Sequence, residues 1–145
     1  MQREHIHVDS FYLADSAQVV GGKLYVLGGG WNSLDLKGPK DGVGLISVTG
    51  RILVPVEESD REFEFSIYLD FVSDPDIMLG GPRLRGVIRP KVPPTNEQSV
   101  ETATPFAFDL FGLTFPRAGE YAFVISHEGE ELARTRFQVN FRNSL

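Results

Sequence analysis

The sequence predicts an all-β fold, a two-sheet antiparallel β-sandwich of the immunoglobulin-like or Greek-key type with about eight strands. Three segments, 44–54, 63–71 and 133–142, alternate between apolar and polar residues over nine or more positions. Such alternation gathers the apolar side chains on one face of a strand, but not of a helix. Fifteen glycines and nine prolines suit a chain of strands and turns. Eleven phenylalanines provide a large aromatic core. An up-and-down barrel is the alternative.

The first part of the chain predicts a hairpin with a sharp bend. The expected segments are a polar lead-in (1–6), a strand (7–13), a turn bracketed by Asp15-Ser16 and Gly21-Gly22, a second strand (23–34) and a loop (35–42). The glycine triplet 28–30 interrupts the second strand and predicts a bulge or bend, because glycine adopts backbone conformations that other residues avoid.

The second part predicts an edge strand and a closing hairpin within a single domain over 1–145. Its segments are a strand with a charged face (84–92), a mobile loop (93–104), a strand kinked at Gly112 (106–115), and a hairpin of strands 119–127 and 132–141 with its turn near 128–130. Pro90 makes the first of these an edge, because proline cannot donate to a ladder. Tyr121, shortly after Gly119, is placed like a tyrosine whose hydroxyl bonds back to the backbone at a sandwich corner.

Composition excludes several classes of function. The net charge of −6 disfavours general binding of nucleic acid and of anionic membranes, both of which attract positive surfaces. The absence of cysteine excludes disulfides, thiolate metal sites and cysteine nucleophiles. No apolar run approaches the length of a membrane span, and no signal peptide is evident. We therefore expect a cytoplasmic protein, or a component of a particle assembled in the cytoplasm.

Four blocks together resemble a family of short bacterial β-sandwich proteins known only as a domain of unknown function. The blocks are ADSAQVVGGKLYVLGGGW (14–31), LVPVEESD (53–60), RPKVPPT (89–95) and FPRAGEYAFVISHEGEELARTRFQV (115–139). The resemblance implies a β-sandwich, and it brings no activity, cofactor or catalytic residue to any position. The stretch 74–82 departs from it, since the relatives have a tighter turn there.

Two groups of residues are candidate metal ligands. Asp70, Asp74 and Asp76 lie at a strand end and in the following loop, where sandwich domains gather oxygen ligands for calcium. The alternative is that Asp-Pro-Asp is ordinary turn chemistry and Asp70 faces solvent. His5 and His7 are two residues apart, so an extended chain lets both reach one zinc or nickel ion, but no third ligand is evident nearby.

Two further patterns suggest catalysis or phosphate binding only weakly. Ser126 and His127 precede three glutamates, but a catalytic triad must converge in space rather than in sequence. The glycine triplet lacks the Lys-Ser/Thr pair and helix start of a phosphate-binding loop, so a structural bulge is the better interpretation. No cofactor is predicted.

Partner-binding candidates come from one aromatic residue and one basic strip. Trp31 follows the glycines, and tryptophan is favoured at the centre of interfaces, although a lone tryptophan in a small sandwich is more often core. The strip is Arg83, Arg85, Arg89 and Lys91. It either prevents edge-to-edge pairing or docks an acidic surface, including segment 57–62 of a neighbouring copy.

The sequence thus predicts a non-enzymatic protein-interaction or structural module that binds a protein partner or itself, for example as a subunit or decoration of a phage-derived particle. The alternative is a β-sandwich that binds a small molecule or carbohydrate through Trp31, Tyr68 and loops at the sandwich end, with calcium in the acidic loop as a less favoured addition. A third hypothesis is an enzyme, for which the acidic cluster and His127 provide the only evident chemistry.

Overall fold

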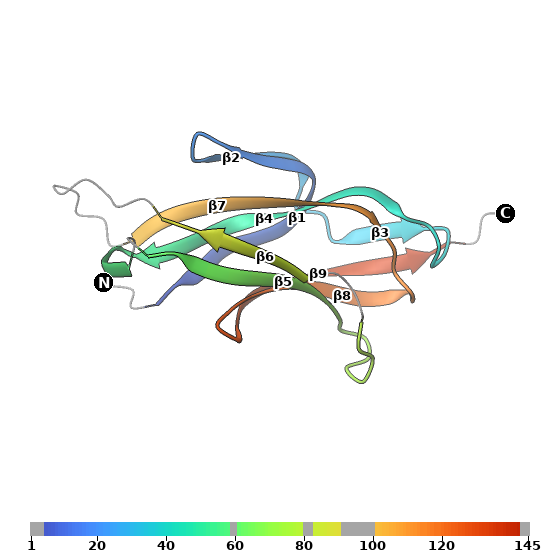
Figure 1. The fold of residues 1–145 in the computed structure, drawn as a ribbon. Coiled ribbons are helices and arrows are strands. Elements are labelled where there is room, and N and C mark those ends of the chain that lie inside the picture. Colours follow the sequence, from blue (N-terminus) through green and yellow to red (C-terminus); the bar gives the residue numbers. More distant parts are fainter. Residues whose placement is uncertain (1–4, 59–60, 80–82, 91–100, 143–145) are drawn as a thin grey trace.

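The protein is described by a computed structural model over residues 5–58, 61–79, 83–90 and 101–142, which form a two-layer β-sandwich (Figure 1). In the described residues the strands are β1 (His7–Val20), β2 (Lys23–Gly29), β3 (Ser33–Leu36), β4 (Val43–Pro55), β5 (Phe63–Phe71), β6 (Arg83–Ile88), β7 (Glu101–Leu113), β8 (Gly119–His127) and β9 (Glu130–Phe141). A 3₁₀ turn, η1 (Val56–Glu58), follows β4. The predicted all-β sandwich is confirmed, with nine strands in the described residues rather than eight.

The strands form two sheets, with the order β2-β1-β4-β7 in the first and β3-β9-β8-β5-β6 in the second. The pairing is antiparallel except between β3 and β9, which are parallel. This exception differs from the purely antiparallel prediction, and it arises where the chain leaves β2 and crosses to the other sheet. The glycine triplet makes this crossing, with positive φ at Gly28 and Gly30.

The core lies between the two sheets and follows the predicted alternation. On β5 the side chains of Phe63, Phe65, Ile67 and Phe71 are buried, as predicted. The closing hairpin also forms as predicted, with β8 over 119–127 and a turn at 128–129. Its aromatic residues join the core, where Tyr121 lies 5.0 Å from Phe115 and 5.9 Å from Phe137 between ring centroids.

Tyr121 makes the predicted return to the backbone. Its hydroxyl donates to the Arg117 carbonyl oxygen at 2.6 Å and accepts from the Arg117 amide at 3.2 Å. Because the hydroxyl is satisfied inside the protein, a large aromatic side chain can be fully buried at the corner without an unpaired polar atom. Burial raises the pKa of this phenol above its ordinary value.

Several predicted boundaries are wrong. The predicted loop 35–42 begins inside β3, which ends at Leu36, and the predicted strand 84–92 ends at Ile88. Asp15-Ser16 was predicted as part of a turn, yet both residues lie inside β1, because the ladder with β2 continues from Ala14 to Val20. The turn is only Gly21-Gly22, with φ of 59° and 75°. The predicted mobile loop 93–104 is also wrong at 101–104, where the chain pairs with 52–55 of β4. Residues 93–100 lie outside the described residues.

One polar face is buried where the alternation predicts solvent. Ser47 and Thr49 on β4 are fully buried, because β4 is an inner strand of the first sheet. Both hydroxyls have partners, since Ser47 donates to the Asp109 carboxylate and Thr49 donates to the Phe106 carbonyl at 2.8 Å. These hydrogen bonds fasten the edge strand β7 to β4.

Candidate functional site

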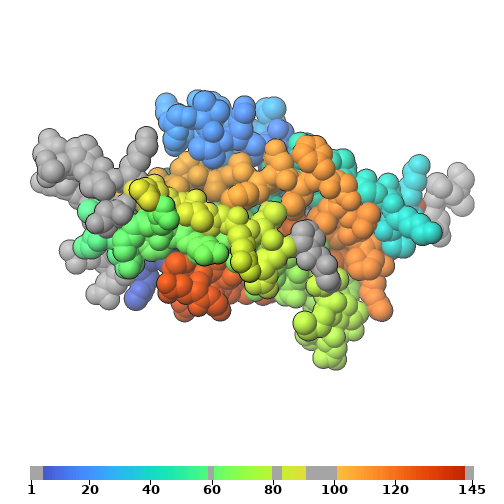
Figure 2. All heavy atoms as spheres, viewed as in Figure 1, coloured from blue at the N-terminus to red at the C-terminus, as the bar shows by residue number. Residues whose placement is uncertain are grey.

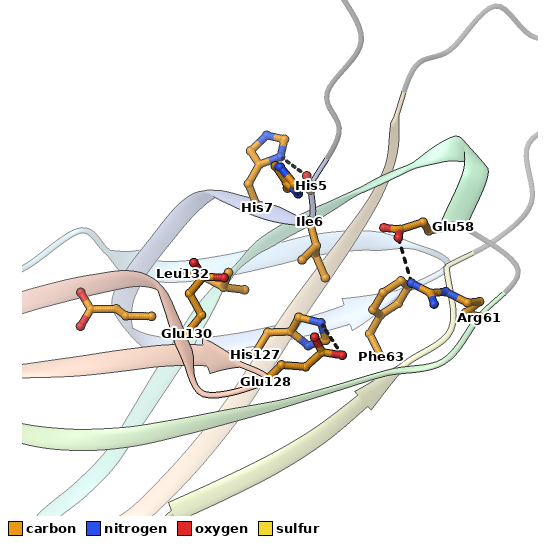
Figure 3. Close-up of a pocket in the computed structure, with 11 residues that line it drawn as sticks. His5, Ile6, His7, Glu58, Arg61, Phe63, His127, Glu128, Glu130 and Leu132 are labelled. Atoms are coloured by element: carbon orange, nitrogen blue, oxygen red, sulfur yellow. Dashed lines mark hydrogen bonds and ion pairs between the residues drawn. The ribbon is translucent and has the colours of Figure 1, made fainter.

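A hollow lies at the end of the sandwich where β8 turns into β9. It has a volume of about 460 Å³. Three groups of residues line it: the histidines His5, His7 and His127; the charged residues Glu58, Arg61, Glu128, Glu130 and Glu131; and the apolar residues Ile6, Phe63 and Leu132. Figure 3 shows that these residues come from the N-terminal segment, the start of β5 and the β8–β9 turn. We call this site the histidine cleft.

His127 is the best-defined histidine of the cleft. Its Nδ1 lies 2.9 Å from the Glu64 carbonyl oxygen, so Nδ1 carries the proton and donates it to this hydrogen bond. The remaining nitrogen, Nε2, lies 3.7 Å from the Glu128 carboxylate. The ring packs against Phe63 at 5.6 Å between centroids. His127 is therefore held in one orientation, with Nε2 toward the acidic wall.

The other two histidines lie on the N-terminal segment at the far wall of the cleft. His7 Nδ1 is 3.4 Å from both the His5 carbonyl oxygen and a carboxylate oxygen of Glu101. Ile6 packs against the core, so the predicted polar lead-in 1–6 is anchored at this residue. The structure thus brings together His5, His7 and His127, which sequence reasoning treated as two unrelated features.

The contacts inside the cleft can be compared with the predicted metal and catalytic groups. Within the described ranges, no group of three or more His, Asp or Glu side chains could hold a metal ion, so the predicted His5–His7 pair has no third ligand there. No hydroxyl of the described residues hydrogen bonds to His127, and Ser126 is joined to it only through the backbone. Glu58 pairs with Arg61 and Glu131 pairs with Arg134, so within the described residues the negative charge of the walls comes mainly from Glu128 and Glu130.

The predicted calcium ligands are not brought together. Asp70 pairs with Arg134, with 3.5 Å between Oδ2 and Nη1. Asp74 instead accepts a hydrogen bond from the Asp76 amide at 3.0 Å, which is the ordinary local turn of an Asp-Pro-Asp sequence. The metal prediction at this loop is therefore not supported, because the carboxylates are engaged separately and form no shared cage.

Two residues of the predicted basic strip, Arg83 and Arg85, lie on β6, which is an edge strand as predicted. The strand ends at Ile88, so Arg89 and Pro90 follow it rather than lying inside it as predicted. Arg83 stacks on the Tyr68 ring at 4.8 Å, and Arg89 forms an ion pair with Glu62 of the same chain. Segment 57–62 therefore meets the strip within one molecule, at Arg89. Arg85 is exposed, and Lys91 lies outside the described residues.

Trp31 follows the glycine triplet and lies against the core rather than projecting from the surface. It is half-buried, and its indole Nε1 is buried without an acceptor among the described atoms. Trp31 therefore contributes to the packing of the core, and its predicted role as a partner anchor stays a prediction.

A surface that sequence reasoning missed is the β1–β2 hairpin. Figure 1 shows it standing away from the two layers, and in Figure 2 it forms a ridge at the top of the molecule. Four apolar side chains of the hairpin are exposed: Val19, Val20, Tyr25 (53%) and Leu27 (73%). Nearby on the same sheet, Phe111 of β7 is 75% exposed. The available signal was the run KLYVLGG, apolar on both faces with a single charge.

The chain matches one known family over most of its length. The model of a family described as a family of unknown function, DUF6941, matches residues 9–140. The chain belongs to this family. The matched residues of the DUF6941 family include the whole β1–β2 hairpin, whereas His5, Ile6 and His7 of the histidine cleft precede them.

Other comparisons add no relative. No curated protein and no solved structure matches this chain significantly. Among the described residues, none of the helical structure is long and apolar enough to cross a membrane.

Proposed function

We propose that this protein of the DUF6941 family is a non-enzymatic protein-interaction module whose contact surface is the β1–β2 hairpin. The observation that carries the proposal is the exposed apolar face of the hairpin beside an open strand edge. In the described residues β2 pairs with β1 alone, so its outer backbone groups have no strand partner. An open edge with exposed apolar side chains is a template for another strand, and natural proteins usually block such edges.

The strand order supports an immunoglobulin-like assignment, an architecture that many binding modules share. In immunoglobulin domains the strands B and E are neighbours in one sheet, and C, F and G are neighbours in the other. Here β4 and β7 are neighbours in one sheet, as B and E are, and β5, β8 and β9 are neighbours in the other sheet, as C, F and G are. The corner hydrogen bond of Tyr121 near the start of β8 fits the same scheme. The fold does not by itself define a function, so the interaction role rests on the hairpin surface.

We place the action of the protein in the cytoplasm, or in a particle assembled there. The absence of cysteine fits a reducing compartment, in which disulfides do not form. A role as a subunit or decoration of a larger particle is one form of the proposed interaction, and recovery in a stoichiometric high-mass species would identify it.

A second candidate function is binding of a small cationic ligand in the histidine cleft. Its volume of about 460 Å³ falls within the range of small-molecule sites, roughly 300–1,000 Å³. Glu128 and Glu130, which form no ion pair with an arginine in the described residues, favour positive charge, and Phe63 and Leu132 supply apolar contact. We favour this cleft over the predicted ligand site at Trp31 and Tyr68, because Trp31 packs partly against the core and Arg83 lies over the Tyr68 ring.

One capture experiment separates the two candidates. Tagged wild-type protein is recovered from its native source, fractionated by size and analysed by mass spectrometry beside two charge-changing variants, Leu27→Glu and Glu130→Lys. Both positions are exposed, so neither change costs the fold much. We expect Leu27→Glu to reduce the co-eluting protein at least tenfold and Glu130→Lys to leave it unchanged. Partner recovery that is equal in wild type and Leu27→Glu would overturn the proposal. Native mass spectrometry of the same samples tests the cleft, because a small cationic ligand that is bound to wild type and lost from Glu130→Lys would favour it.

A further inference from the structure

Within the described part of the chain, the outer edge of β2 has a defined set of backbone groups without a strand partner. The turn before β2 has positive φ at both Gly21 and Gly22, which is the two-residue type I′ geometry. This turn directs the backbone of Lys23 toward Val20 on β1. Because backbone direction alternates along a strand, the N–H and C=O groups of Leu24 and Val26 face away from β1. These groups can be satisfied by a further extended strand.

The side chains of β2 show which strand fits. Lys23, Tyr25 and Leu27 share one face, opposite Val20, Gln18 and Ser16 of β1 in the ladder. Tyr25 and Leu27 are exposed, and an apolar hollow of about 300 Å³ lies over this part of the hairpin, lined by Ser16, Ala17, Gln18, Tyr25, Val26 and Leu27. A partner strand must therefore present apolar side chains with the same two-residue spacing.

We propose that the occupant is the β2 strand of a second copy, paired antiparallel with Tyr25 on the twofold axis. This inference rests on the proposed function and names its partner. In this register Leu24 lies opposite Val26 of the other copy, and by the twofold symmetry Val26 lies opposite Leu24 of the other copy. The four free groups on each strand are then all used, and the two four-stranded sheets become one continuous sheet.

The side-chain chemistry of this register is self-complementary. The two Tyr25 rings meet across the axis in a pair without backbone hydrogen bonds, in which side chains approach most closely. Leu27 of each copy lies opposite the alkyl chain of Lys23 of the other. Cross-strand pairs of aromatic and aliphatic side chains stabilise sheets, whereas like charges placed opposite each other destabilise them.

Charge favours a β2–β2 contact over self-pairing of the other long edges. Lys23 is the single charged residue of β2, and the two Lys23 side chains lie on opposite sides of the axis. Self-pairing of β6 would instead bring Arg83 and Arg85 against the same residues of the second copy. The other edge of the first sheet, β7, contains Pro105, which cannot donate a hydrogen bond.

Cysteine crosslinking tests the register, because the chain has no cysteine of its own. In a Tyr25→Cys variant, the two Cα atoms across the axis would lie about 4.5 Å apart. Disulfides span roughly 4.4–6.8 Å between Cα atoms. We expect this variant to form a covalent dimer under mild oxidation at least tenfold faster than Arg85→Cys, the matched exposed control on β6. Equal rates for the two variants would overturn the proposal.

A mixing experiment makes the register test stricter. Leu27→Cys alone should crosslink slowly, because its two copies would lie four residues apart, on the order of 13 Å along the strand. Mixed with Lys23→Cys, it should crosslink about as fast as Tyr25→Cys alone. A mixture that reacts no faster than Leu27→Cys alone would contradict this register.

Sedimentation velocity on the wild type covers the possibility that a cysteine variant folds poorly. Val26→Pro removes an N–H group that faces away from β1, so the hairpin itself loses no ladder hydrogen bond. We expect its dissociation constant for the dimer to rise at least tenfold above that of the wild type. A wild type that stays monomeric at all concentrations, together with slow crosslinking, would overturn the second-copy proposal. The capture experiment with Leu27→Glu would then decide separately whether the hairpin binds a different protein.

Discussion

Strands β2 and β6 are both sheet edges, but they differ in charge and in how they contact the core. On β6 the exposed face carries Arg83 and Arg85, and the opposite face packs inward through Gly86 and Ile88. On β2 the exposed face carries Tyr25 and Leu27, and in the described residues no buried side chain belongs to this strand. Strand β6 is thus packed on the core and carries charge on its exposed face, whereas β2 projects from the sandwich and exposes apolar side chains. This difference supports the proposal that β2, rather than β6, is the edge at which another strand pairs.

The largest expected effect concerns how β6 is packed on the core. A Cβ atom at Gly86 would overlap the Phe65 ring. That ring cannot simply move aside, because Phe106 and Phe108 lie 5.9 Å and 5.7 Å from it between centroids. We expect Gly86→Ala to lower the free energy of unfolding by about 1–3 kcal/mol, the usual cost of overpacking a core. The measurement is urea unfolding followed by tryptophan fluorescence.

The matched control is Leu27→Ala on β2. Leu27 is 73% exposed, so its truncation should change the free energy of unfolding by less than about 0.5 kcal/mol. If the two substitutions lower the free energy of unfolding by the same amount, the two edge strands do not differ in how they pack on the core.

The next effect concerns the charge on β6. The double change Arg83→Val and Arg85→Val would leave an apolar stripe beside Val87, which is already 63% exposed. In a Tyr25→Glu background, which removes association through β2, we expect this double variant to regain concentration-dependent association. Sedimentation velocity over a hundredfold range of concentration measures it. Should the triple variant stay monomeric throughout, the arginines are not what keeps this edge unpaired.

The strands were predictable because their signal is local. On β5 the apolar residues alternate with polar ones, and this alternation alone is enough to predict a strand with one buried face. The hairpin boundaries were less predictable, since Asp15 and Ser16 are turn formers in isolation but are held in β1 by pairing with β2. Ser47 and Thr49 also follow a polar pattern, yet tertiary packing buries both. Local pattern therefore predicts which residues form strands better than it predicts what covers them.

The candidate surfaces were harder to predict than the strands. The histidine cleft joins residues from 5–7, 58–63 and 127–132, which only the sheet topology brings together. The hairpin surface has the opposite difficulty, because Tyr25 and Leu27 lie in a run that is apolar on both faces. Such a run is typical of a buried strand, and only the position of β2 at the sheet edge shows that one face is uncovered.

The smallest expected effect comes from ion pairs on the surfaces of the two sheets. Asp9 pairs with Arg51 between β1 and β4, and Glu62 pairs with Arg89 beside β6. All four side chains are at least about a third exposed, so removing either pair by Asp9→Asn or Glu62→Gln should lower the free energy of unfolding by less than about 1 kcal/mol. Urea unfolding measures both, with crosslinking through Tyr25→Cys as a second readout that should not change.

The pKa of Asp9 predicts how the stability difference between wild type and Asp9→Asn changes with pH. The hydrogen bond from Arg51 lowers the pKa of the Asp9 carboxyl below its ordinary value. A lowered pKa in the folded state stabilises the protein above the unfolded pKa of about 3.9, and this contribution is lost as the pH falls through the folded value. The difference between wild type and Asp9→Asn should therefore be present at pH 7 and disappear at low pH. A difference that persists in acid would show that Asp9 acts through packing rather than charge. For Glu62→Gln the contrary result is a change in dimer formation, which would show that Arg89 takes part in association once its ion-pair partner is removed.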